Sequence, residues 1–474
     1  MSAQAKSLNP PAHRRSFWRQ ARETLEMPVL AIITALAVGA VIIVLTDLKV
    51  MGEFRDTSGR LVPVGYLYLV LALVFGVTGV ALYFGAAKVL RQWMKAPQRW
   101  HVIALQWGGG VSGLFLAYIF LRSAGFAAAL EGAWGAVATA YGAMGAGSLG
   151  SLSTMIAAVQ SGDQEAILQA FYPILESLVA ATPFIFAGLS VALGFQCGLF
   201  NIGAQGQLVM GAIFSAFVGY SLKGLPSLAH IPLALGAGAL GGALWAFLPA
   251  ILKAKVGTHE VINTIMLNWI AIRLSEWLLN GPMKRPGTAN PVSPTVEASA
   301  FLPRFFPDPI RFHLGFFIAL AAAAFIWWFL FRTTWGFEIR TVGMNPNAAR
   351  YAGMSITRNY VIAFCLAGAL AGLAGANDVL GVNHNLAVAF AGGTGFDAIA
   401  LALLGKSHPF GVVLAALMFG TLQSGGTRMQ NVAKIPVDII FVVQALVIAF
   451  IAAPAIIRLL YRYRDERVAV AKSK

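Results

Sequence analysis

Charged residues are scarce in this chain. Only 11% of its 474 residues are Asp, Glu, Lys or Arg, whereas a soluble domain carries about 25%. Too few charges are present to solvate a folded surface of this size. Hydrophobic residues make up 58% of the chain. The composition therefore predicts an integral membrane protein.

Cysteine is almost absent as well. Cys197 and Cys365 are the only two, and both lie in or beside apolar stretches. Two such thiols form neither a disulfide framework nor a metal site. The net charge of +15 does not indicate nucleic acid binding, because the basic residues lie between hydrophobic stretches and not on one patch. This distribution is typical of the cytoplasmic loops of membrane proteins.

Long hydrophobic runs recur along the sequence. A helix needs about 20 mostly apolar residues to cross a bilayer. The Gly-rich candidates 386–404 and 410–427 are shorter, and form either full spans or a re-entrant pair. The sequence predicts an all-α polytopic bundle of about 10–12 transmembrane helices. The other spans lie near 28–46, 64–87, 101–121, 172–195, 201–220, 229–251, 260–280, 312–331, 359–380 and 436–455.

The loop charges predict an orientation and a division of the chain. Basic loops alternate with less basic ones, as the positive-inside rule requires if both termini are cytoplasmic. We expect a multi-pass membrane protein with both termini in the cytoplasm. It begins with a cytoplasmic segment, 1–27, and a first span plus an apparent inserted pair of spans, 28–135. A core, 136–455, and a cytoplasmic basic tail, 456–474, follow. The outer loop 281–311 is a partial exception, because it carries four basic residues. It also contains seven prolines, and we expect it to be irregular.

Polar residues interrupt the apolar sequence in three places. Residues 198–207 contain one Asn and two Gln beside three Gly. Such a break exposes backbone groups that can face a cavity, although an ordinary loop is the alternative. Glu260 and Asn263 share a helical face and either cap the helix or form a functional site. Asp378 and Asp397 either line a translocation path or cap helices.

Two local patterns predict helix structure. Gly238/Gly242 and Gly368/Gly372 have the small-xxx-small spacing that allows helices to pack closely. Within 332–358, an Asn-Pro-Asn sequence offers a cap and an early helical proline, which predicts a short helix between two spans.

No catalytic pattern is present. The sequence from Leu404 to Ser407 resembles the end of a phosphate-binding loop, but Ala400 replaces the required first glycine. Zinc, nucleophile-elbow and Cys-x-x-Cys patterns are missing. We therefore predict no enzyme activity, no metal and no cofactor.

Four short sequence motifs occur in a definite order along the chain. They lie within 182–189, 198–207, 257–268 and 395–405. Together they resemble the permeases of ABC importers for nucleosides and simple sugars, within the branched-chain amino acid/ribose-type permease superfamily. The resemblance covers roughly 170–455 and the first span, and makes the core a permease core. The segment 49–135 departs from the family pattern.

The resemblance implies a substrate pathway and a coupling loop. The family usually has Glu where this chain has Gln205, which removes a charge. We predict that the pathway contains Phe200, Asn201, Gln205, Gln207, Glu260, Asn263, Asn268, Asp378 and Asp397. The short cytoplasmic helix is expected to dock on an ATPase through a coupling loop that contains Arg340, Gly343, Asn345, Ala348, Ala349 and Gly353.

The resemblance also implies a location, partners and a function. The location is a bacterial-type cytoplasmic (inner) membrane. We expect ATP-binding subunits in trans, a second homologous permease subunit, an extracytoplasmic substrate-binding protein and the lipid bilayer. The predicted function is ATP-driven import of a nucleoside or a related small solute. A monosaccharide permease is the alternative within the class, and an ATPase-independent secondary transporter is the alternative outside it.

Overall fold

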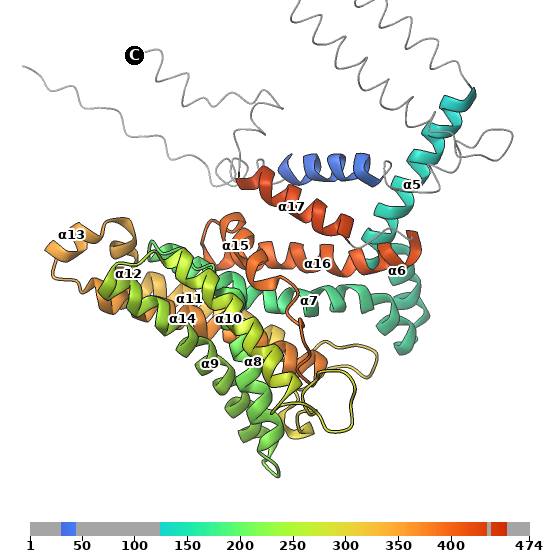
Figure 1. The fold of residues 1–474 in the computed structure, drawn as a ribbon. Helices are drawn as coiled ribbons and strands as arrows, with labels where there is room; N and C mark the ends of the chain where they lie inside the picture. Colours follow the sequence, from blue (N-terminus) through green and yellow to red (C-terminus); the bar gives the residue numbers. More distant parts are fainter. Residues whose placement is uncertain (1–29, 44–123, 434–437, 453–474) are drawn as a thin grey trace, which may run out of the picture. The chain divides into compact units, whose positions relative to one another are not determined.

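A computed structural model describes residues 30–43, 124–433 and 438–452 of the chain. These residues form an all-α fold (Figure 1). After a helix over Leu30–Ile43, the elements are α5 (Ala124–Ser148), α6 (Leu152–Ser161), α7 (Gln164–Gln196), α8 (Ala204–Ser221), α9 (Ser227–Val256), α10 (Glu260–Asn280), the 3-10 helix η1 (Ala298–Ala300), α11 (Gly315–Arg332), α12 (Thr334–Met344), α13 (Pro346–Tyr351), α14 (Ile356–Asn377), the π-helix η2 (Asp378–Asn383), α15 (Thr394–Leu404), α16 (Pro409–Ala433) and α17 (Asp438–Ala452).

The helices confirm the predicted fold class. Among the described residues, five helices are long and apolar enough to cross a membrane: α7, α9, α11, α14 with η2, and α16. A sixth is obtained if α5 and α6 are counted as one broken span. This pair, whose first helix is rich in Gly and Ala, was not predicted from the sequence. The predicted spans 64–87 and 101–121 lie outside the described residues, as do most of the two terminal segments.

The structure distinguishes the two Gly-rich candidates. The second forms α16, a full-length helix. The first is not a full span, because residues 384–393 form bends and turns and only the 11 residues of α15 are helical. Eleven residues rise about 16 Å, roughly half the thickness of the hydrocarbon core. Gly392 takes a left-handed φ of 52°, which glycine adopts without strain, just before α15 begins.

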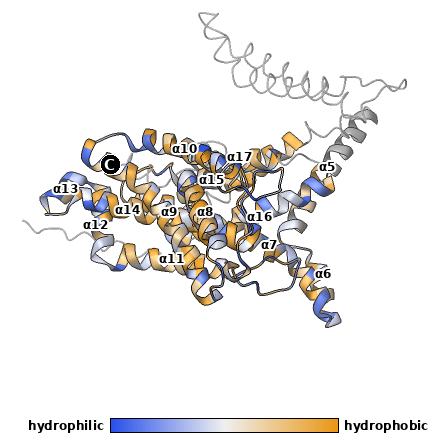
Figure 2. Ribbon diagram, turned by 60° about the horizontal axis from the view of Figure 1, so that its bottom comes forward, coloured by the Kyte–Doolittle hydropathy of each residue, from blue (hydrophilic) through white to orange (hydrophobic). Residues whose placement is uncertain are grey.

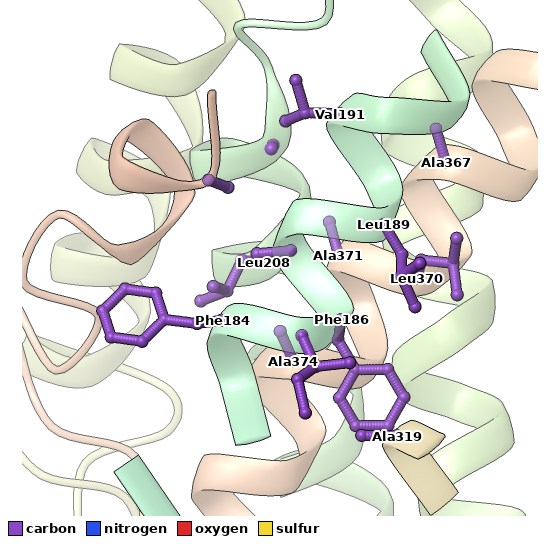
Figure 3. Close-up of a cluster of buried hydrophobic side chains, with 14 of the residues drawn as sticks. Phe184, Phe186, Leu189, Val191, Leu208, Ala319, Ala367, Leu370, Ala371 and Ala374 are labelled. Atoms are coloured by element: carbon purple, nitrogen blue, oxygen red, sulfur yellow. The ribbon is translucent and has the colours of Figure 1, made fainter. Parts of the chain in front are cut away.

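Residues Met144–Thr427 belong to one compact unit, whereas 124–143 and 428–433 belong to a second. The centre of the first unit is α7, whose residues from Ala181 to Gly194 are all buried. Its side chains meet α8, α11 and α14 in an apolar cluster that includes Phe186, Leu208 and Leu370 (Figure 3). Burial on all sides explains why α7 shows no polar face.

Close glycine contacts join α8, α9 and α14. A Cβ added to Gly372 would overlap the carbonyl oxygen of Gly238, and one added to Gly242 would overlap that of Gly368. Gly211 of α8 lies equally close to the backbone of Gly372. The predicted small-xxx-small packing is therefore confirmed, and the three backbones touch directly.

The two ends of the first unit differ in character. Hydrophilic residues gather at α13 (Figure 2). The loop 281–314 leads into the first residue of α11, a helix of 18 residues that is about 27 Å long, whereas α12 and α13 follow its last residue. The loop is irregular apart from η1, as predicted. Several of its basic residues have partners close by: Arg285 with Thr295, Arg304 with Asp308, and Arg311 with Glu176. Two of the four basic residues of the loop, Arg304 and Arg311, thus pair with a carboxylate.

Candidate functional site

The turn that joins α7 to α8 is set by Gly198. Its φ of 71° lies in the left-handed region. The N–H of Gly198 donates to the carbonyl of Phe195, and the N–H of Leu199 donates to that of Gly194. These two bonds form a Schellman motif, which ends a helix and satisfies its last carbonyls. The chain can therefore leave α7, run through Asn201 and start α8 within a few residues.

Asn201 and Gln207 pair with each other inside the bundle. The Nδ2 of Asn201 donates to the Oε1 of Gln207 over 3.0 Å, and the Nε2 of Gln207 donates to the Oδ1 of Asn201 over 3.1 Å. Asn201 Nδ2 also lies 3.3 Å from the Oγ of Ser190 on α7. Both amides are buried. In a low-dielectric interior such a reciprocal pair is strong, and losing one member leaves the other unsatisfied.

Asn268 and Gln205 satisfy the backbone at two helix starts. The first backbone N–H groups of a helix have no partner within that helix. Asn268 lies on α10, about 12 Å along the helix from its first residue. Its side chain accepts a hydrogen bond from the N–H of Gly206 over 2.8 Å and donates one to the carbonyl of Ile202 over 2.9 Å. Gln205 accepts from the N–H of Gly395, in the first turn of α15, over 2.8 Å. Four predicted pathway residues thus make buried hydrogen bonds around the start of α8, and we call this set the amide network: Asn201, Gln205, Gln207 and Asn268.

The aromatic residue and the two aspartates of the prediction lie outside this network. Phe200 is partly exposed and packs against Phe195 with ring centroids 5.2 Å apart. Asp397 lies in the first turn of α15, where a carboxylate suits the helix dipole. Asp378 begins η2, and α14 continues into η2 without a break. Asp378 is the C-cap residue of α14, and its backbone N–H donates to the carbonyls of Ala374 and Gly375.

Glu260 and Asn263 lie at the turn between α9 and α10. The carboxylate of Glu260 forms an ion pair with the Nζ of Lys253 at 2.8 Å. Asn263 donates to the Oγ1 of Thr258 over 2.6 Å. The N-cap of α10 is His259, whose side chain makes no capping hydrogen bond. These contacts fasten the two helices together at this end, and the structure does not bring either residue to the amide network.

The structure also shows two buried polar residues that the sequence did not single out as site residues. Within the described chain, both side-chain amide atoms of Asn377 and the Nε2 of His313 lack hydrogen-bond partners. Both side chains lie against Gly315, where an added Cβ would overlap them. Burial, with the nearby Arg304 guanidinium, lowers the pKa of His313 from 6.5 to about 4. No local sequence signal marks this pair, because only the fold brings the loop 281–314 to α14.

The segment α12–α13 has the predicted short helix. Asn345 is its N-cap, and its side chain accepts from the N–H groups of Asn347 and Ala348, with Pro346 at the first helical positions. Ala348 is exposed whereas Ala349 is fully buried. Asn345 and Gly353 are also exposed, together with Met344 and Tyr351.

The arginines of this segment are mostly engaged within the chain. Arg358 forms an ion pair with Glu338 at 2.6 Å, and Asn359 donates to the same carboxylate. The bonds from Asn359 and Arg358 lower the pKa of Glu338 below its usual value. Arg340 donates to the carbonyl of Leu330 over 2.9 Å. These contacts hold α12 against α11 and α14 and leave the exposed side of α13 free of ion pairs among the described residues.

The contact from Gln205 to Gly395 makes a testable prediction. We expect Gln205→Leu to lower the stability of the protein by about 1–3 kcal/mol, because the N–H of Gly395 would be buried without a partner. Gln205→Glu is the matched control, since its carboxylate keeps an acceptor at a helix N-terminus. The measurement is the melting temperature of both variants in detergent. A leucine variant that melts at the wild-type temperature would contradict this role.

Comparisons with known proteins show which proteins this chain is similar to. The model of the family described as branched-chain amino acid transport system / permease component matches residues 173–452. The guanosine ABC transporter permease protein NupP of Bacillus subtilis (strain 168) is 41% identical over 291 residues, which cover 60% of this chain and 83% of that protein. No solved structure matches significantly.

Two further relatives differ in the solute named. The glucose ABC transporter permease protein TsgB13 of Haloferax volcanii is 39% identical, with 59% of this chain and 76% of the relative covered. The nucleoside ABC transporter permease protein NupB of Lactococcus lactis is 37% identical, with 60% of this chain and 80% of the relative covered. The family model places this similarity to permease subunits in residues 173–452.

Proposed function

The chain belongs to the branched-chain amino acid transport system / permease component family, and we propose that it is the permease subunit of an ATP-driven importer of nucleosides. The family match carries this proposal, because residues 173–452 include both the amide network and the α12–α13 segment. Membership of this family makes the chain a multi-pass membrane protein. The guanosine and nucleoside permeases among its relatives favour a nucleoside over other solutes.

The proposed subunits are those of an ABC importer. ATP-binding subunits in trans would dock on the exposed side of α13, around Ala348 and Gly353. A second homologous permease subunit would complete the pore, and an extracytoplasmic binding protein would deliver the solute. With α13 on the cytoplasmic side, the loop 281–314 faces outward and both termini are cytoplasmic.

The substrate pathway is proposed from the predicted residues that remain accessible. Phe200 is partly exposed and Asp397 is partly buried beside the amide network. Nucleosides offer an aromatic face and hydrogen-bonding edges, which suit an aromatic ring and a polar group better than a fixed cluster of charges. The buried amides Asn201, Gln205 and Gln207 support the pathway by holding the helix starts around it.

A monosaccharide is the second candidate, and the glucose permease among the relatives favours it. Hydroxyl groups of a sugar would use much the same polar partners. The two candidates differ in the aromatic base, which only a nucleoside presents to Phe200.

Transport by the purified complex tests the function. The complex is isolated through a tag on this chain and reconstituted in vesicles, and uptake of labelled guanosine, uridine, ribose and glucose is measured with and without ATP. We expect ATP-dependent nucleoside uptake that excess unlabelled nucleoside abolishes and glucose does not. ATP-dependent glucose uptake that nucleosides leave unchanged would select the second candidate, and solute uptake without ATP would contradict an importer of this type.

A further inference from the structure

The turn after α7 touches the end of α12 directly. A Cβ added to Gly198 would lie 2.9 Å from the carbonyl oxygen of Gly343 and 3.1 Å from its Cα. A Cβ added to Gly343 would lie 2.8 Å from both the carbonyl carbon of Cys197 and the nitrogen of Gly198. The contact is backbone against backbone. Neither position accepts a side chain unless the two segments move apart.

The same turn is bound to the helices behind it. Gln196 donates through Nε2 to the carbonyl of Ser407, in the turn between α15 and α16, over 2.9 Å. The thiol of Cys197, fully buried, lies 3.8 Å from the carbonyl of Asn359 on α14. The turn thus contacts both α12, which leads into α13, and the turn that follows α15.

The amide network joins the turn to the starts of α8 and α15. Only a few residues separate Gly198 from Asn201, which is paired with Gln207, and from Gln205, which holds Gly395. Asn201 and Gln207 are buried and reciprocally bonded, and the buried Gln205 side chain is bonded to the backbone of Gly395, so these polar groups resist displacement. A shift of Gly343 must therefore shift the turn and the two helix starts, or open the contact.

We propose that the Gly198–Gly343 contact is the joint through which movement of α13 reaches the helix starts of α8 and α15. Gly198 and Gly343 are positioning residues in this role, and they touch neither nucleotide nor solute. The inference rests on the proposed function and extends it from where the ATPase docks to how docking acts on the pathway. A packing contact without this role would affect the amount of folded protein but not the yield of transport per ATP.

Gly343→Ala is the sharpest test. Position 343 is helical, and alanine is a better helix former than glycine, so the only penalty falls on the contact itself. Gly236→Ala is the matched control, because Gly236 is also helical and an added Cβ there meets nothing within 4 Å. Both variants are purified as the whole complex and reconstituted in vesicles. ATP hydrolysed per solute imported is measured, together with the amount of ATPase that co-purifies.

We expect Gly343→Ala to raise the ATP hydrolysed per solute by at least about fivefold, a typical size for coupling between sites. The ATPase should still co-purify, and Gly236→Ala should match the wild type. A reduced amount of folded protein lowers hydrolysis and uptake together and leaves their ratio unchanged. An unchanged ratio of ATP hydrolysed to solute imported in Gly343→Ala, or loss of the ATPase from the complex, would contradict the proposal that the Gly198–Gly343 contact transmits movement of α13. Failure of the wild-type complex to import any solute with ATP would instead overturn the proposed function.

Discussion

Gly372→Val is expected to prevent stable folding of this chain in detergent. The added side chain would meet the carbonyl oxygen of Gly238 on α9. Gly242 on α9 and Gly211 on α8 also lie close to the backbone of Gly372. Side chains forced into a packed core typically cost 1–3 kcal/mol, and backbone groups on two sides cannot rotate away, so we expect a loss of at least about 3 kcal/mol. The measurement is the melting temperature and the monodisperse fraction in size-exclusion chromatography.

Gly236→Val is the control for this prediction. Gly236 lies on α9, one of the same three helices, but is exposed, and an added Cβ there meets nothing within 4 Å. We expect the control to elute and melt like the wild type. If both variants melt at the same temperature, the three backbones do not depend on direct contact, and the packing account of the core is wrong.

Ala348→Trp is expected to abolish ATP-dependent uptake while the chain keeps its wild-type melting temperature. Ala348 is exposed on α13, so a large side chain there meets only the ATPase that the proposed function places against it. The small residues of α13 would allow a partner to approach closely, and an indole ring would hold it away. Uptake in vesicles and co-purification of the ATPase measure the effect.

The neighbouring residue provides the contrast. Ala349 is fully buried against the protein itself. Ala349→Trp should therefore lower the melting temperature, because the ring has no room inside the fold. Full ATPase binding and uptake by Ala348→Trp would show that the ATPase docks elsewhere. Equal melting temperatures for the two tryptophan variants would show that α13 is not packed as described.

Much of the local structure was predictable from neighbouring residues. The Asn345-Pro346 pair predicted α13, because a cap and a helical proline act within one turn of chain. The glycine spacings in α9 and α14 predicted close packing, although not which helices meet. The 386–404 segment was less predictable, since an apolar Gly-rich run suits either a span or a turn, and contacts of Gly395 with Gln205 decide where α15 starts.

The sequence by itself determined that this chain is a helical membrane protein of a permease family, because apolar composition, helix caps and ordered motifs depend on residues close together in the chain. Only the tertiary structure decided what the polar residues do. Asn201 and Gln207 pair with each other, Asn268 caps α8 from another helix, and Gly198 meets Gly343. Such contacts join residues from different helices, and in an apolar interior each buried polar group takes the partner that the packing of the helices brings within reach.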